Sequence, residues 1–176
     1  MTVRTLLVSS VVLVSLVIGA RDVCSETPNQ AFNGRIITAA KSFPRQAKSP
    51  QAYVAAVRKL SQVNFYEAKD THTWKVYYAA FLKAKLDDVE YVIKLYELNG
   101  RSQQLLASFD QFTDERGQQT ILANMTLDKK MVGVNKELLM TLENKGKVMA
   151  SGRFKILGEG EHYSGKVDFS EDDKDE

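Results

Sequence analysis

The side chains that could do chemistry are few and scattered along this sequence. Nucleophilic catalysis by serine needs a histidine and a carboxylate within reach, often around a G-x-S-x-G turn, and the chain has no such motif. His162, Ser164 and Asp168 are close in sequence, but these even-numbered positions share one face of a strand, so we interpret them as a solvated face. His72, beside Trp74, is interpreted as a surface or packing histidine.

Ligands for metals and cofactors are equally scarce. Two histidines and one cysteine are too few for a zinc finger, an iron–sulfur site or a disulfide framework. The Gly158-Glu159-Gly160 segment lacks the third glycine and the lysine of a phosphate-binding loop, so it predicts a hairpin turn. The acidic run in residues 170–176 lacks the ligand spacing of an EF-hand. We therefore predict no catalytic residue, no metal site and no cofactor.

Composition places the chain among ordinary globular proteins. It has 176 residues, of which 44% are hydrophobic and 26% are charged. The formal net charge of +2 is far below the basic excess that nucleic-acid binders carry, so nucleic acid is not an expected partner.

The N-terminus predicts export. Arg4 precedes a run from Thr5 to Ala20 without an ionised side chain, which is typical of a signal peptide and short for a membrane-spanning helix. We expect residues 1–20 to be a signal peptide, with a retained N-terminal anchor as the alternative. The protein is accordingly expected in the periplasm or outside the cell, either released or held at the membrane.

Two residues could be modified after export. Cys24 is the only thiol, so it is either unpaired or forms an intermolecular disulfide. Lipid attachment at Cys24 is disfavoured because the residues before it, 21–23, are not the small ones that the lipoprotein motif requires. Asn124 begins an Asn-Met-Thr sequon and would be a glycosylation site in a eukaryotic host.

Residues 21–34 are interpreted as a linker and residues 35–70 as a short helical segment. Arg35–Ser42 predicts a short helix that ends before Pro44. A second, amphipathic helix is expected from Pro50 to about Gln62, because Ser49 is a suitable N-cap and a proline follows it. Its apolar stripe consists of Tyr53, Ala56, Val57 and Leu60.

From residue 71 to residue 169 the hydrophobic period changes to two, which predicts strands. The first run, residues 73–86, also admits a helical interpretation through Trp74 and its neighbours. The Asn99-Gly100 dipeptide predicts a hairpin with a type I′ turn. Seven short runs without intervening helices indicate antiparallel pairing. They lie within 73–86, 89–96, 105–109, 121–127, 134–142, 148–156 and 163–169.

The expected fold is mainly β: an antiparallel two-layer sandwich of about seven strands, preceded by one or two short helices, with a small β-barrel as the alternative. The helices should cover one sheet face, with Tyr53, Val57 and Leu60 packed against Tyr77, Ala79 and Phe81.

The stretch Lys136–Ile156 resembles a late hairpin of immunoglobulin-like domains. The resemblance covers about twenty residues and implies no functional residue. The chain also lacks the paired cysteines of antibody domains.

Charge is divided unevenly along the chain. Residues 21–85 carry a net charge of +7 and residues 86–176 carry −6, and the acidic tail 170–176 is expected to be disordered. The two halves could neutralise each other within one fold, or the basic part could attract a partner. The candidate partner-binding residues are Arg35, Lys41, Arg45, Arg58 and Lys59.

The sequence thus predicts an exported, non-enzymatic protein-binding or assembly module at the cell envelope, with an unidentified protein partner. A carrier of a small apolar ligand in a β-sandwich or barrel is the alternative. A hydrolase with acids brought together from distant strands is the third hypothesis.

Overall fold

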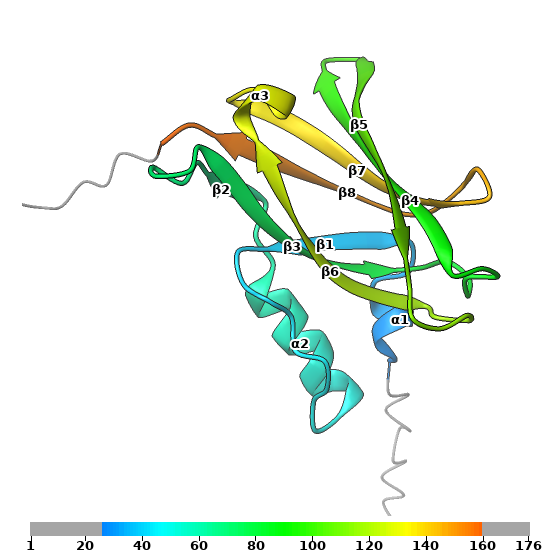
Figure 1. The fold of residues 1–176 in the computed structure, drawn as a ribbon. Helices are drawn as coiled ribbons and strands as arrows, with labels where there is room; N and C mark the ends of the chain where they lie inside the picture. The colour runs from blue at the N-terminus through cyan, green and yellow to red at the C-terminus, as the bar shows by residue number, and fades with distance from the viewer. Residues whose placement is uncertain (1–25, 160–176) are drawn as a thin grey trace, which may run out of the picture.

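A computed structural model describes residues 26–159, and these residues form one curled sheet with α1 and α2 on its outer face (Figure 1). The order of the strands is β5-β4-β7-β8-β1-β3-β6, and β2 pairs with β8 beside this path. The strands are β1 (Arg35–Ala39), β2 (Asn64–Tyr66), β3 (Thr73–Phe81), β4 (Glu90–Asn99), β5 (Ser102–Phe112), β6 (Thr120–Asp128), β7 (Lys136–Asn144) and β8 (Lys147–Leu157). The helices are α1 (Pro28–Ala31), α2 (Pro50–Leu60) and α3 (Lys129–Val132).

The predicted mainly β class is confirmed. Every strand expected between residues 73 and 156 is present, and the ambiguous first run is the strand β3, not a helix. β3 ends at Phe81, earlier than the expected residue 86, because the backbone then bonds to the β5–β6 loop: Leu82 N–H and Leu86 N–H donate to the carbonyls of Gln119 and Gln118.

The helix expected over Arg35–Ser42 is wrong, because Arg35–Ala39 is the strand β1. The pair Ile36-Ile37 and Thr38 are β-branched, and the segment finds partners on both sides, antiparallel to β3 and parallel to β8. The helical segment therefore shrinks to α2, and the region given as a linker holds the one-turn helix α1. The expected amphipathic helix is confirmed, with Ser49 accepting a hydrogen bond from Ala52 N–H at its start.

Antiparallel pairing is confirmed among the expected strands, β3 to β8, whereas the two parallel pairs involve β1 and β2, which the sequence did not predict. β8 pairs in parallel with β1 at Arg35 and Ser151, and with β2 at three consecutive pairs. At this junction the backbones approach so closely that a Cβ on Gly152 would lie 2.2 Å from the carbonyl oxygen of Ile36. Only glycine fits there, because any side chain would displace β1.

The β4–β5 hairpin is confirmed, but its turn type differs from the expected one. Gly100, not Asn99, has a positive φ (61°) and is the first of the two central residues, which is the pattern of a type II′ turn. A turn with two positive φ angles occurs instead between β7 and β8, at Lys145 (49°) and Gly146 (76°). This is the type I′ pattern.

Two apolar clusters stabilise the fold, one on each face of the sheet. The larger fills the inside of the curl with residues from β3, β4, β6, β7 and β8, including the fully buried Trp74, Ile93, Met140 and Phe154. The smaller lies between α2 and the outer face of β1 and β3, where Tyr53 and Val57 pack with Ala79 and Phe81. This confirms that the helix covers the sheet, although Tyr77 is only half-buried.

Several expectations concern residues outside the described part of the chain. These are the signal peptide (1–20), Cys24, the last strand (163–169) with His162, Ser164 and Asp168, and the acidic tail (170–176). In the described part, 26–159, no helix has the length and apolar character needed to cross a membrane.

Gly152→Ala is expected to destabilise the protein by about 2 kcal/mol or more, because the added methyl group overlaps the Ile36 carbonyl and forces β1 away from β8. Chemical denaturation followed by circular dichroism measures the loss. Ser151→Ala, a change at the neighbouring position, is the control and should cost far less. A Gly152→Ala protein as stable as the wild type would contradict the close approach of the strands.

Val57→Ala tests the packing of α2 on the sheet. Val57 is fully buried among Tyr53, Ala79 and Phe81, so removal of its two methyl groups should lower the free energy of unfolding by about 2 kcal/mol. Lys59→Ala, on the exposed side of the same helix, should stay within about 0.5 kcal/mol of the wild type. Equal effects of the two changes in thermal unfolding would refute the packing.

Candidate binding surface

The basic surface of the protein comes from one continuous segment, residues 27–66. This segment contains six lysines and arginines and no aspartate or glutamate. All six cations are exposed, whereas most of the large apolar residues of the segment are buried, with Val63 and Tyr66 as the exposed exceptions. They are Arg35, Lys41, Arg45, Lys48, Arg58 and Lys59.

The packing of α2 determines where the cations lie. Because its apolar stripe faces the sheet, Arg58 and Lys59 lie on its outer side, in the last turn, where they also complement the negative end of the helix dipole. The Arg58 guanidinium lies 5.8 Å from the centroid of the Phe32 ring, and this ring lies 4.7 Å from Phe81. The aromatic contact thereby connects the exposed cation to the outer core.

The ion pairs of the described residues lie elsewhere. Those pairs are Lys94–Glu143 (2.6 Å), Lys136–Glu97 (2.6 Å), Lys129–Glu67 (2.9 Å) and Arg153–Glu137 (4.0 Å), and His72 Nδ1 also lies 2.7 Å from Glu67. None of the six cations of residues 27–66 belongs to an ion pair within residues 26–159. The acids in these pairs are therefore compensated by cations outside residues 27–66, and the six cations of the basic segment have no ion-pair partner in the described part.

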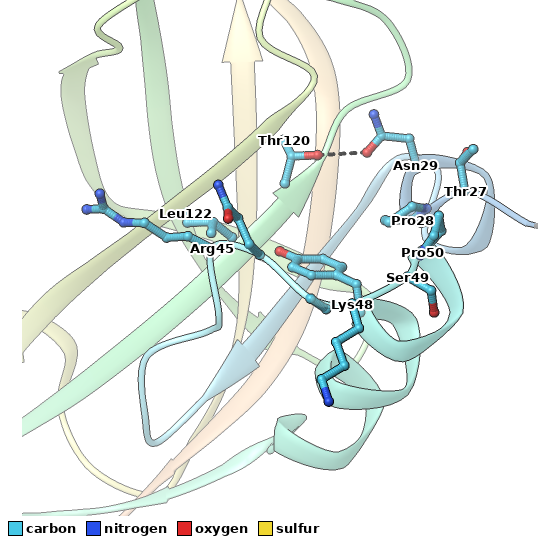
Figure 2. Close-up of a pocket in the computed structure, with 12 residues that line it drawn as sticks. Thr27, Pro28, Asn29, Arg45, Lys48, Ser49, Pro50, Thr120 and Leu122 are labelled. Atoms are coloured by element: carbon cyan, nitrogen blue, oxygen red, sulfur yellow. Dashed lines mark hydrogen bonds between the residues drawn. The ribbon is translucent and has the colours of Figure 1, made fainter.

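A pocket of about 650 Å³ opens in this basic surface (Figure 2). Its walls are α1, the loop before α2, the start of α2 and the beginning of β6. Arg45 and Lys48 supply its charge, and Figure 2 shows their side chains extending in different directions from the loop. The remaining lining residues are Thr27, Pro28, Asn29, Gln46, Ala47, Ser49, Pro50, Tyr53, Thr120 and Leu122.

Local interactions hold the walls of this pocket in place. The Thr120 hydroxyl donates a hydrogen bond of 2.7 Å to Asn29 Oδ1 and connects α1 to β6 (Figure 2). A capping box between Thr27 and Gln30 closes the start of α1. The three prolines of the chain, at positions 28, 44 and 50, all lie in this part and restrict its backbone.

Tyr53 is the polar residue of the pocket that packs most deeply. It is 9% exposed, and its hydroxyl makes no hydrogen bond with any residue of the described part. Burial raises the pKa of the Tyr53 hydroxyl above its ordinary value, so the group is a protonated donor at neutral pH. The hydroxyl itself is reached by solvent at the pocket, since no buried side-chain polar atom of the described part lacks a partner, so a ligand acceptor could replace the water there.

A second cluster joins ionisable groups at the opposite end of β3. The Glu67 side chain is 1% exposed and lies 2.7 Å from His72 Nδ1, and Lys129 Nζ donates to both its oxygens at 2.9 and 3.1 Å. Ligand atoms of Glu67, His72 and Glu159 lie within 4.8 Å of one another and could hold a metal ion. Since the Lys129 ammonium already compensates Glu67, a second cation there would be repelled, and we interpret the cluster as structural.

The structure brings only some of the candidate residues together. Arg45 lies at the pocket, and Arg58 and Lys59 lie on α2, whereas Arg35 lies at the start of β1 beside Arg153, in a different cavity of about 510 Å³. Lys41 is exposed in the loop after β1. Asn124 is exposed on β6, as its alternation with Ala123 and Met125 predicts.

Sequence reasoning missed Lys48 and Tyr53 as site residues. Tyr53 was assigned to the apolar stripe, which is correct for its ring, but the lack of a partner for its hydroxyl depends on tertiary contacts. Lys48 could have been found, because it precedes the N-cap Ser49 by one position and lies in the same loop as Arg45.

Comparison with models of known protein families finds no match to this chain, and a search of curated proteins finds no similar sequence.

Glu67→Gln is expected to lower the thermal midpoint near neutral pH and to flatten the acid limb of the stability profile. The hydrogen bond from Lys129 holds the pKa of Glu67 below its ordinary value of 4.5. The carboxylate therefore stabilises the fold fully above about pH 4.5, and this contribution is lost as the pH falls through the lower pKa of the folded state. Glutamine has no such titration.

Thermal unfolding of both proteins from neutral to acidic pH tests this expectation. The gap between the two midpoints should narrow below about pH 4.5. Effects of other acids such as Glu97, whose pKa is also lowered, cancel in this difference because both proteins contain them. A gap that stays constant down to strongly acidic pH would show that the pair with Lys129 does not stabilise the folded state.

Proposed function

We propose that the protein is an exported, non-enzymatic module that binds an acidic segment of a partner protein at the cell envelope. The binding surface is the basic surface formed by the loop between β1 and α2 and by α2 itself. The observation that supports it best is the absence of any ion pair, within residues 26–159, at the six exposed cations of residues 27–66. Charge that is not neutralised within the fold raises the local concentration of an acidic partner and the rate of its association.

The alternative of an apolar carrier has less support. Packed side chains fill the inside of the curled sheet, where a carrier of this kind would hold its ligand. Each described pocket includes charged residues, and two of them border the inner cluster only at Ile36 and Tyr91. The hydrolase hypothesis lacks a candidate base, because the described cluster of acids and histidine, at Glu67, is engaged by Lys129.

For the architecture we favour the small-barrel alternative over the immunoglobulin-like sandwich. Hydrogen bonds join all eight described strands into one sheet, and the two edge strands, β5 and β6, both contribute residues to the same inner cluster. A curled sheet of this kind is an incomplete barrel. The proposal includes export because the sequence of residues 1–20 has the pattern of a signal peptide.

The double charge reversal Arg45→Glu and Lys48→Glu tests the proposed surface. Binding of a fluorescent polyglutamate peptide, measured by anisotropy, should weaken by about tenfold or more, because two favourable charge interactions become repulsive. For the wild type the affinity should fall steeply as salt rises from about 0.05 to 0.5 M.

The matched control is Lys85→Glu with Lys147→Glu, two exposed lysines outside residues 27–66 that give the same change of net charge. This variant should bind the peptide nearly as well as the wild type. An equal loss in both variants would assign binding to net charge alone and overturn the proposed surface. Binding that does not respond to salt would overturn its electrostatic basis.

A further inference from the structure

We propose that the pocket between α1, α2 and β6 binds a carboxylate carried on an apolar body, such as a medium-chain or arylalkyl carboxylic acid. This ligand site goes beyond the proposed partner-binding surface, although it lies within that surface. The pocket offers positive charge, a hydroxyl donor and apolar walls. These match the negative charge, an acceptor oxygen and the apolar body of such a ligand.

The negative end of the ligand matches the charge of the pocket. Arg45 and Lys48 are its charged lining residues, and no acid of residues 26–159 lines it. Neither cation has an ion-pair partner among residues 26–159. Both side chains are exposed, so they can turn toward a carboxylate at the pocket mouth without breaking a contact (Figure 2).

The Tyr53 hydroxyl supplies the specific contact. It lines the pocket, belongs to a residue that is nine-tenths buried, and has no acceptor within the described part of the chain. A carboxylate oxygen is the strongest acceptor available to such a donor, since hydrogen bonds to charged groups are stronger than those to neutral ones. The neighbouring hydroxyl of Thr120 is already engaged by Asn29.

The apolar body of the ligand matches the remaining walls. Pro28, Ala47, Pro50 and Leu122 line the pocket together with the Tyr53 ring. The volume of about 650 Å³ falls within the range typical of small-molecule sites. A purely polar anion would leave the apolar walls of the pocket in contact with water and gain no free energy from their burial. Inorganic phosphate is therefore not the expected ligand.

The other described cavity with two arginines lacks these features. The cavity near Arg35 and Arg153 includes the buried Thr38, but the Thr38 hydroxyl already donates to the Gln62 carbonyl at 2.6 Å. A hydroxyl donor that lines the cavity and has no hydrogen-bond partner within residues 26–159 therefore distinguishes the pocket at Tyr53.

The same carboxylate chemistry could come from a free small molecule or from an acidic side chain or C-terminus of a partner protein. The test separates these sources. Amide NMR of the mature chain is recorded during titration with phenylbutyrate, with phenylbutanol as the uncharged ligand of the same shape. We expect saturable shifts at Ala47, Thr120 and Leu122 with phenylbutyrate, and weaker binding of the alcohol by about tenfold.

Tyr53→Phe is the sharpest variant. It removes one oxygen that has no partner in the described fold, so the thermal midpoint should not fall, whereas phenylbutyrate affinity should fall by about five- to tenfold. Arg45→Gln with Lys48→Gln should weaken phenylbutyrate binding at least as much. Lys85→Gln with Lys147→Gln, at exposed sites away from the pocket, should leave it unchanged.

Each outcome decides between the sources or against the site. Saturable phenylbutyrate binding that is weakened by Tyr53→Phe supports the pocket. If polyglutamate binding is unchanged in the same variant, the small carboxylic acid and the acidic peptide bind at separate sites. Loss of both ligands in Tyr53→Phe shows that a partner's carboxylate enters the same pocket. Polyglutamate binding without saturable phenylbutyrate shifts, or equal binding of phenylbutanol, overturns the carboxylate site and leaves the partner-binding surface standing. Phenylbutyrate binding without polyglutamate binding overturns the partner surface alone.

Discussion

The close approach of β8 to β1 at Gly152 is the constraint on which the rest of the structure depends. One part of the sheet is the run β5-β4-β7-β8, and the other is β1-β3-β6; only β8 connects them. The connection is short, with one β1–β8 pair at Ser151 and three pairs to β2. Because Gly152 has no side chain, the Ile36 carbonyl can lie against it, and the sheet can curl around one apolar cluster.

The position of β1 in the middle of the sheet explains why the basic segment lies where it does. β1 and β3 expose apolar side chains on the outer face, at Ala39, Ala79 and Phe81, and an apolar face must be covered. The chain leaves β1, forms the loop with Arg45 and Lys48, and returns as α2 over that face. Burial of one side of α2 leaves its cations on the other side. The basic surface is thus a consequence of covering the outer sheet face with a segment that contains no acid.

Local signals predicted much of this fold, and the failures have a common cause. The alternation between residues 73 and 156 and the Ser49-Pro50 helix start depend on neighbours in sequence, so they could be read correctly. β1 could not be predicted in this way, because its five residues are compatible with both a helix and a strand. Their conformation depends on pairing with residues more than forty positions away, such as Ala80 and Ser151. The same holds for Glu67 and Lys129, and for the unpartnered hydroxyl of Tyr53, which a sequence shows only as part of an apolar stripe.

The distribution of charge connects stability and binding. Glu67, Glu97 and Glu143 are buried acids of the β2–β8 region, and each is compensated by a lysine of that region at 2.6 to 2.9 Å, so burial does not leave their charges unpaired. The cations of residues 27–66 need no such compensation, because they are exposed and water solvates them. Their mutual repulsion is a small cost spread over a loop and a helix, and an incoming carboxylate reduces it. The same segment therefore packs by its apolar residues and binds by its charged ones, and the pocket at Tyr53 lies where the two kinds of side chain meet.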